Sequence, residues 1–515
     1  MATPPAAELE LSGAGLTLAD AAALLDGRVT ALRLSDAARR NVERSRQALM
    51  AKLARGETIY GVNTGFGKLA NQRIPESDVL DLQVNLLRSH AVGLGPLLPL
   101  GVSRLAQALR IQALAKGYSG VTPQLIDALI AVFNRGIVPA IPEQGSVGAS
   151  GDLAPLAHLA LVVIGEGQVH HATGAMAGGE ALRQAGLEPY RLQAKEGLSL
   201  INGTQISTAL LADALVRAQQ LATIADVAGA MTLEATKSSL KPFDERIQRV
   251  RPHPGQAVCA ANVRRLLEGS EILPSHAGCS KVQDAYSIRC MPQVHGSMRD
   301  ALRFVAGVVE CEMNSATDNP LVFAEEGDVL SGGNFHAQPV ALAADVLAAA
   351  IADLSSISER RIENLVNPDL SGLPGFLTPH PGLNSGLMIV QVLAAALVSE
   401  NKALAHPASV DSIPTSANRE DHVSMAPCAA RKARSIVTNA TRVLAAELLC
   451  AAQGLNFERR LRPGRGVEAA YRWIRETVPP LDRDRVLHGD LEAIERMIVD
   501  GSLRVEVEAA CGALI

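Results

Sequence analysis

A short segment of small residues carries the most suggestive chemistry in this chain. Gly145–Gly151 is followed by Asp152 and then by an apolar run, Leu153–Ile164, with helical spacing. In a tight bend, the sterically open amide nitrogen of Gly151 can attack the carbonyl carbon two residues earlier. Loss of water, including the Ser150 hydroxyl, would leave an electron-poor methylene before a helix N-terminus, where the positive potential favours an electron acceptor. The same residues also fit a plain turn capped by Asp152, so the tripeptide alone is not diagnostic.

Other motifs that could carry chemistry lack their required context. Residues 65–70 (GFGKLA) imitate a dinucleotide-binding fingerprint, but no preceding strand, βαβ unit or downstream acidic residue accompanies them. The twelve histidines include no H-E-x-x-H, and the adjacent His170 and His171 cannot share one helical face. No G-x-S-x-G elbow surrounds Ser146 or Ser150. The sequence therefore disfavours a dinucleotide site, a structural zinc site and a serine hydrolase.

Composition indicates the kind of scaffold that must position such a site. The 515 residues carry 48 Lys+Arg against 53 Asp+Glu, a net charge of −5, with 48% hydrophobic and only 3% aromatic residues. This excludes a disordered chain, disfavours a nucleic-acid binder, and favours helices over sheets. The seven cysteines are widely spaced without a C-x-x-C pair, and residues 1–20 lack a signal-peptide pattern. We therefore expect a mostly all-α, soluble, cytoplasmic protein with reduced thiols and no membrane span.

Apolar residues recur three and four positions apart over most of the chain, which predicts long helices. The expected helices are Ser35–Leu53, Val79–Leu94, Val102–Ala115, Pro123–Phe133, Thr204–Leu233, Val294–Asn314, Gln338–Val366, Gly386–Ala405 and Met425–Cys450. Gln168–His171 has the pattern of a short hairpin. Because no clean linker or repeat occurs, we expect one continuous unit over residues 1–515. Within this unit, we expect only a weak subdivision between an N-terminal part, 1–200, and a long-helix bundle with the C-terminal part, 201–515. Loops on this helical scaffold would hold the site.

Family-like blocks cover most of the chain, from residue 60 to about residue 490. Gly145–His158 (GSVGASGDLAPLAH) resembles the signature of the aromatic amino acid ammonia-lyases. Six further blocks occur in family-like order: Tyr60–Gly67, Asn85–Gly95, Lys195–Thr208, Lys281–Gly296, Asn314–Pro339 and Glu400–Met425. The resemblance implies a long helical bundle of the ammonia-lyase/fumarase-like type with a loop-built active site. It also implies a homotetramer with active sites shared between subunits.

The resemblance further implies a self-made electrophile and assigns roles around it. Ala149, Ser150 and Gly151 would cyclise without help into 4-methylidene-imidazol-5-one (MIO), with no external cofactor and no metal. Tyr60 matches the tyrosine that removes the β-proton of the amino acid, for which a phenol must be activated by nearby donors or dipoles. A planar guanidinium suits a carboxylate, and Arg289 matches the arginine that binds the substrate carboxylate. Asn202 would form a hydrogen bond with the same carboxylate or with the amino group of the substrate. Gln283, Tyr286 and Phe335 match positions that surround MIO and the substrate in relatives.

Two residues bear on which amino acid is the substrate. His90 and Glu420 match positions that contact the imidazole side in histidine-acting relatives, whereas relatives acting on phenylalanine or tyrosine generally carry glutamine at the second position. A carboxylate accepts the imidazole N–H hydrogen bond, which a phenyl ring cannot offer. The resemblance therefore implies elimination of ammonia from L-histidine to give trans-urocanate. Arg419 departs from the family pattern, and if turned inward it would pair with Glu420 and change ring recognition.

Several alternatives stay open at this point. The same chemistry on tyrosine or phenylalanine, or an aminomutase, would use the same electrophile. A fumarase-like lyase is faintly suggested by Ser287-x-x-x-Met291-Pro292, and a non-enzymatic helical scaffold is the last alternative. Without the family-like blocks, His90 would be interpreted as a buried core histidine and Glu420 as a carboxylate near the N-terminus of a helix.

Overall fold

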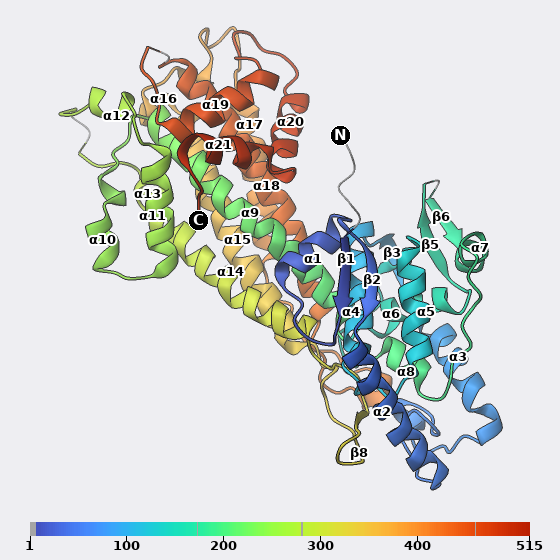
Figure 1. Ribbon diagram of the computed structural model, residues 1–515. Coiled ribbons are helices and arrows are strands. Elements are labelled where there is room, and N and C mark those ends of the chain that lie inside the picture. The colour runs from blue at the N-terminus through green and yellow to red at the C-terminus, as the bar shows by residue number, and fades with distance from the viewer. Residues whose placement is uncertain (1–6, 173, 280–281, 459) are drawn as a thin grey trace. The chain divides into compact units, whose positions relative to one another are not determined.

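The computed structural model describes residues 7–172, 174–279, 282–458 and 460–515 of the chain (Figure 1). Lys281, the first residue of one family-like block, lies outside the described residues. Across these ranges, 21 α-helices accompany four sheets of two short strands each. The prediction of a mostly all-α protein is therefore confirmed.

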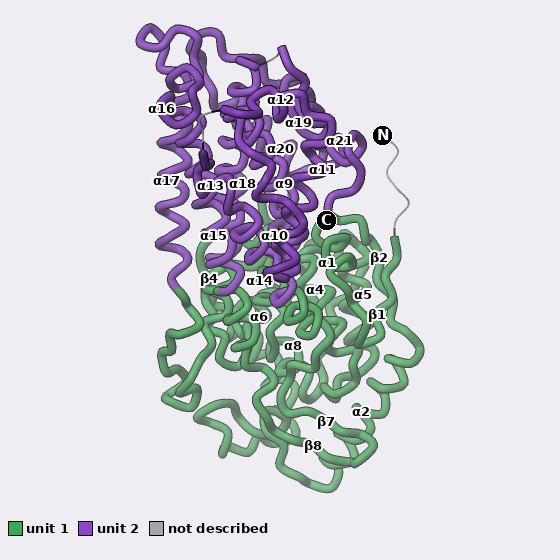
Figure 2. Tube along the Cα trace, turned by 90° about the vertical axis from the view of Figure 1, so that its left-hand side faces the viewer, with its two compact units in different colours: residues 1–213, 306–345, 407–431 green, residues 214–305, 346–406, 432–515 purple. Residues whose placement is uncertain are grey.

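The chain forms two compact units, and each takes residues from three separate segments (Figure 2). Unit 1 consists of residues 1–213, 306–345 and 407–431, and unit 2 of residues 214–305, 346–406 and 432–515. This division differs from the expected soft boundary at residue 200. The reason is that four long helices contribute residues to both units: α9 (Gln205–Ala235), α14 (Met291–Met313), α15 (Gln338–Val366) and α18 (Ala426–Asn456).

Within its described residues, unit 1 combines helices with four pairs of short strands. Its helices are α1 (Leu18–Leu25), α2 (Asp36–Ala54), α3 (Val79–His90), α4 (Leu100–Ala115), α5 (Pro123–Asn134), α6 (Leu153–Val163), α7 (Gly178–Gln184) and α8 (Glu196–Ile201), with 3-10 turns η1 (Gly67–Leu69), η2 (Glu76–Asp78) and η5 (Ser416–Asn418). β1 (Ala7–Leu11) and β2 (Val29–Leu34) pair in parallel. The antiparallel pairs are β3 (Leu94–Leu97) with β4 (Pro142–Gln144), β5 (Gln168–His171) with β6 (Gly174–Ala177), and β7 (Leu321–Phe323) with β8 (Asp328–Leu330).

Among the described residues of unit 2, the named secondary-structure elements are all helices, joined by loops. Besides its parts of the long helices it contains η3 (Lys241–Phe243), α10 (Glu245–Arg249), α11 (Pro254–Leu266), α12 (Ile272–Ser275), α13 (Tyr286–Arg289), α16 (Pro368–Ser371), η4 (Gly375–Leu377), α17 (Met388–Leu404), α19 (Arg465–Thr477), α20 (His488–Val499) and α21 (Ser502–Cys511). By length and composition α15 and α18 are long and apolar enough to cross a membrane. However, 56% and 83% of their apolar windows are buried inside the protein, as in the core helices of soluble proteins.

The expected helices agree with the structure except at some ends. Gln338–Val366 matches α15 at both ends, and the short hairpin begins at Gln168 as expected. The helix expected over Val79–Leu94 is wrong at its C-terminal end, because α3 stops at His90 and Leu94 belongs to β3. The main-chain pairing of Leu94 with Gln144 takes precedence there over the continued apolar spacing.

Candidate active site

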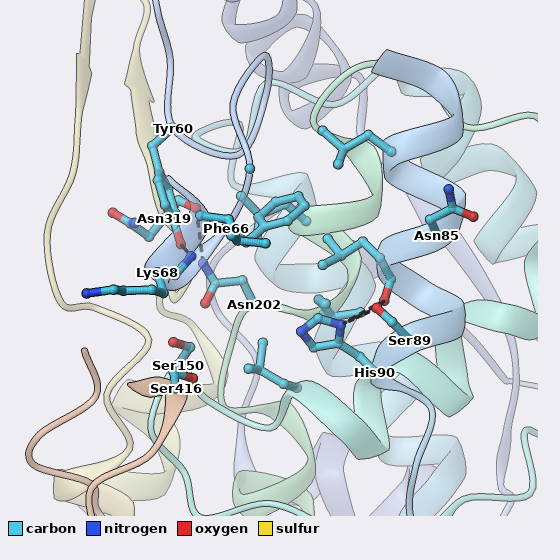
Figure 3. Close-up of a pocket in the computed structure, with 18 of the residues that line it drawn as sticks. Tyr60, Phe66, Lys68, Asn85, Ser89, His90, Ser150, Asn202, Asn319 and Ser416 are labelled. Carbon is cyan, nitrogen blue, oxygen red and sulfur yellow. Dashed lines mark hydrogen bonds between the residues drawn. The ribbon is translucent and has the colours of Figure 1, made fainter. Parts of the chain in front are cut away.

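A cavity of about 660 Å³ in unit 1 gathers side chains from distant parts of the chain (Figure 3). It is bounded by the loop after α2, by α3, by the turn before α6, by α8 and by two later loops. Six residues singled out from the sequence line it: Tyr60, His90, Ser150, Asn202, Phe335 and Glu420. The fold therefore brings together residues that are up to 360 positions apart in the chain.

The segment that contains Ser150 is sharply bent. The Ser146 hydroxyl donates a hydrogen bond to the Gly151 carbonyl (3.2 Å) and accepts one from the Gly148 amide (3.0 Å). Gly151 has φ +75°, and a Cβ at this position would lie 2.1 Å from the Gly203 carbonyl oxygen. Only glycine fits both this conformation and this close approach. The residue types and the bend therefore match the compact turn that cyclisation requires.

Asp152 occupies the N-cap position of α6, but its side chain makes no capping hydrogen bond there. Its carboxylate instead accepts hydrogen bonds from the Ser207 amide (2.8 Å) and hydroxyl (2.6 Å) at the start of α9. Full burial raises the pKa of Asp152 to about 6, although both Ser207 bonds oppose that shift. Asp152 therefore does not cap α6 through its side chain as expected, and instead connects the turn before α6 to the start of α9.

Tyr60 lies in the turn after α2, with its hydroxyl group against the start of η1. The Gly67 amide donates a hydrogen bond to the Tyr60 oxygen (3.1 Å). The Tyr60 ring also packs edge-on against Phe66, with ring centroids 6.4 Å apart. A backbone donor at this distance stabilises negative charge that develops on the oxygen during proton transfer.

Glu420 is held by three hydroxyl groups at the cavity wall. Its Oε1 accepts a hydrogen bond from the Ser150 hydroxyl (2.8 Å), and its Oε2 accepts hydrogen bonds from Thr415 (2.5 Å) and Ser416 (2.8 Å). Arg419 is exposed, and within the described residues Glu420 has hydroxyl partners in place of an ion pair with Arg419. The inward Arg419 considered from the sequence is therefore absent from this structure.

His90 closes the opposite side of the cavity, at the C-terminal end of α3 (Figure 3). Its Nδ1 lies 2.8 Å from the Leu86 carbonyl oxygen and 3.1 Å from the Ser89 hydroxyl. Because a carbonyl only accepts, this contact places the proton on Nδ1 and leaves Nε2 as an acceptor. Burial lowers the pKa of His90, which favours the neutral imidazole.

Asn202 follows α8 and presents an unpaired oxygen. Its Nδ2 donates to the Asn319 carbonyl (3.0 Å), whereas its buried Oδ1 has no hydrogen-bond partner among the described residues. A buried acceptor without a donor is costly unless a ligand supplies one. Nearby, the fully buried Lys195 ammonium pairs with Asp318 at 2.7 Å, directly before Asn319. Sequence reasoning missed this pair, although the basic residue begins one of the family-like blocks.

Three predicted site residues lie elsewhere, in unit 2. Gln283, Tyr286 and Arg289 are absent from the lining of the cavity and contact one another around α13. The Arg289 guanidinium donates to the Gln283 side-chain oxygen and lies 5.0 Å from the centre of the Tyr286 ring. The Tyr286 side chain is 72% exposed. These three residues therefore do not line the unit 1 cavity, and their membership of a site shared between subunits stays a prediction.

Comparison with known proteins identifies similar sequences and structures. The sequence profile for aromatic amino acid lyases matches residues 16–476. Histidine ammonia-lyase of Anaeromyxobacter sp. is 56% identical over 506 residues, which cover 96% of this chain and 99% of that protein. The crystal structure of histidine ammonia-lyase from Trypanosoma cruzi is 43% identical, with a TM-score of 0.91, and covers 98% of this chain and 96% of that one. Tyrosine aminomutase of Streptomyces globisporus is 36% identical with a TM-score of 0.93, covering 99% of this chain and 100% of that one.

Proposed function

Because this chain belongs to the aromatic amino acid lyase family, we propose that it eliminates ammonia from L-histidine to give trans-urocanate. Relatives that carry this activity in their names match almost the whole chain at 54–56% identity. The single observation that carries the choice of substrate is that both His90 and Glu420 line the cavity that also holds Ser150.

The polar groups of the cavity suit an imidazole better than a phenyl ring. Once the Ser150 hydroxyl has left, Glu420 Oε1 and the Nε2 of His90 both offer acceptors. An imidazole N–H can donate to one of them, whereas an apolar ring offers no donor. Sites with buried polar groups reject analogues that cannot pair them by up to ~10⁴-fold. The polar lining supports histidine over tyrosine or phenylalanine.

We infer that Ala149, Ser150 and Gly151 mature into MIO, and the bend at Gly151 supports this fit. When formed, the group supplies an electron-poor alkene as the electrophile, without an external cofactor or a metal. Around it, Tyr60 takes the β-proton of the substrate while the Gly67 amide stabilises the charge on its oxygen. Asn202 accepts from the substrate amino group, because its Nδ2 is already engaged and its Oδ1 is free.

We also propose that the enzyme works as a homotetramer in the cytoplasm. Gln283, Tyr286 and Arg289 form an exposed cluster that would complete the cavity of a neighbouring copy, where Arg289 would bind the substrate carboxylate. Phe335 already lines the cavity and would lie near the substrate ring. The helix α17 adds an exposed apolar stripe, formed by Ile389, Val392 and Leu393, that suits burial against a second copy. No nucleic-acid or membrane partner is part of this proposal.

A substrate panel tests the proposal. Purified protein is mixed with L-histidine, L-tyrosine or L-phenylalanine, and product formation is followed by ultraviolet absorption and by ammonia release. We expect catalytic efficiency on histidine to exceed that on the other two by at least ~10²-fold. An aminomutase would be recognised by a β-amino acid product with little released ammonia. A preference for tyrosine would overturn the histidine assignment and leave the family membership intact.

A variant of the ring pocket provides the matched comparison. His90→Leu replaces a polar wall by an apolar one of similar size, so it should weaken catalysis on histidine and raise the relative efficiency on phenylalanine. The ratio of kcat/KM for the two substrates is the readout, because a general loss of folded protein would lower both values equally. An unchanged ratio would remove His90 from the ring pocket.

A further inference from the structure

A hydrogen bond connects the Ser150 hydroxyl, which must leave during maturation, to the Glu420 carboxylate, which can accept and donate protons. Ser150 Oγ donates to Glu420 Oε1 at 2.8 Å, across 270 residues of sequence. Thr415 and Ser416 fix the other carboxylate oxygen, so the side chain is held in place against Ser150. Maturation of the segment removes the Ser150 hydroxyl as water, and hydroxide is a poor leaving group unless it is protonated as it departs.

Glu420 is also the only carboxylate among the described residues that line the cavity. The nearby Asp152 is committed to Ser207 and is fully buried. Tyr60 is engaged by the Gly67 amide, and the Nδ1 of His90 is engaged by Leu86. A carboxylate that contacts the departing oxygen directly is therefore the best placed proton carrier for this step.

We propose that Glu420 is the acid–base residue of the chain's own maturation, acting on Ser150 before any substrate binds. This inference rests on the proposed formation of MIO, and it adds a self-processing role to the expected role of Glu420 at the substrate ring. The carboxylate moves the proton that the dehydration of Ser150 requires. It returns to its starting state when the step is complete.

The atoms of the two dehydration steps balance without an outside reagent. First, the Gly151 nitrogen bonds to the Ala149 carbonyl carbon. The C–O bond of that carbonyl then breaks, and its oxygen leaves as water with the amide protons of Gly151 and Ser150, while a C=N double bond forms between the Ala149 carbon and the Ser150 nitrogen. Second, the Cα–H and Cβ–Oγ bonds of Ser150 break and a Cα=Cβ double bond forms. Glu420 takes the Cα proton and delivers it to Oγ, which leaves as water. Both steps are dehydrations that leave the overall oxidation state unchanged, so neither needs an oxidant or a reductant.

Maturation also prepares the site for its substrate. While Ser150 keeps its hydroxyl, Glu420 Oε1 is occupied by that donor. Once the hydroxyl has left, this oxygen is an unpaired acceptor at the cavity wall, and an imidazole N–H can replace the lost donor. The same carboxylate thus serves Ser150 first and the ring of the substrate afterwards.

Intact-protein mass spectrometry tests the inference independently of turnover. Wild-type protein and Glu420→Gln are sampled at intervals after expression, and the fraction of chains lighter by two water molecules is measured. We expect the wild type to complete this loss and Glu420→Gln to lose the second water more slowly by ~10²-fold or more, so that chains accumulate at the loss of one water. Asp421→Asn is the matched control, because it makes the same change at the next residue, whose side chain is exposed.

A rescue experiment separates proton transfer from a structural effect. Glu420→Ala leaves space beside Ser150, and added formate should restore water loss in proportion to its concentration, whereas chloride at equal ionic strength should not. Circular dichroism confirms that each variant is folded. A wild type that keeps its encoded mass would refute MIO formation itself. A Glu420→Gln protein that loses both waters as fast as the wild type would overturn this inference and leave the proposed function standing.

Discussion

Replacing Tyr60 by phenylalanine isolates the hydroxyl group from everything else in the loop that carries it. The substitution removes one oxygen atom and the hydrogen bond from the Gly67 amide (3.1 Å), while the edge-on contact with Phe66 persists. Loss of one such bond costs about 0.5–1.5 kcal/mol in stability. For a chain of this length, that change lowers the melting temperature by no more than about 2 °C.

The expected effect of Tyr60→Phe on catalysis is much larger than its effect on folding. Removal of a general base typically lowers turnover by ~10²–10⁴-fold, which corresponds to about 3–5 kcal/mol in the activation barrier. The assay compares kcat on L-histidine, the melting temperature and the intact mass of the same preparations. The mass should still show the loss of two waters, because Tyr60 does not contact Ser150 through a hydrogen bond. Turnover within about threefold of the wild type in a fully mature variant would refute the assignment of Tyr60 as the base.

Three further outcomes follow from individual contacts. Arg289→Lys keeps the charge but loses the planar fork, so it should raise KM for histidine and lower kcat, and steady-state kinetics identical to the wild type would show that Arg289 does not bind substrate. Lys195→Met leaves the Asp318 carboxylate buried without its partner and should destabilise the fold by about 3–5 kcal/mol in denaturant titrations, whereas a loss below about 1 kcal/mol would contradict the importance of the pair. Burial raises the pKa of Glu234 from 4.5 to about 7, so the folded state binds the extra proton and the stability of the wild type should fall as the pH rises from about 4.5 to 7. Glu234→Gln should flatten that part of the stability-versus-pH curve in thermal melts, and equal slopes for both proteins would refute the assignment.

Much of the local structure could be predicted from the sequence because it depends on neighbouring residues. Apolar spacing located the long helices to within a few residues, as for α15, since periodicity reports directly which face of a helix is buried. The Ala149-Ser150-Gly151 turn was recognisable for the same reason, because the conformational freedom of Gly151 is a property of that residue alone. Where pairing with a distant strand competes with helical spacing, as at Leu94, the same reasoning extended the helix too far.

The residue types of the site, the helical scaffold and the resemblance to the family could all be inferred from the amino-acid sequence. Which of those residues meet depends on the tertiary fold. It brought Glu420 to Ser150, committed Asp152 to Ser207 instead of a helix cap, and left Arg289 with its neighbours in unit 2. The physical reason is that the spacing of residues along a chain encodes local conformation, whereas contacts between segments hundreds of residues apart depend on how all the intervening helices pack.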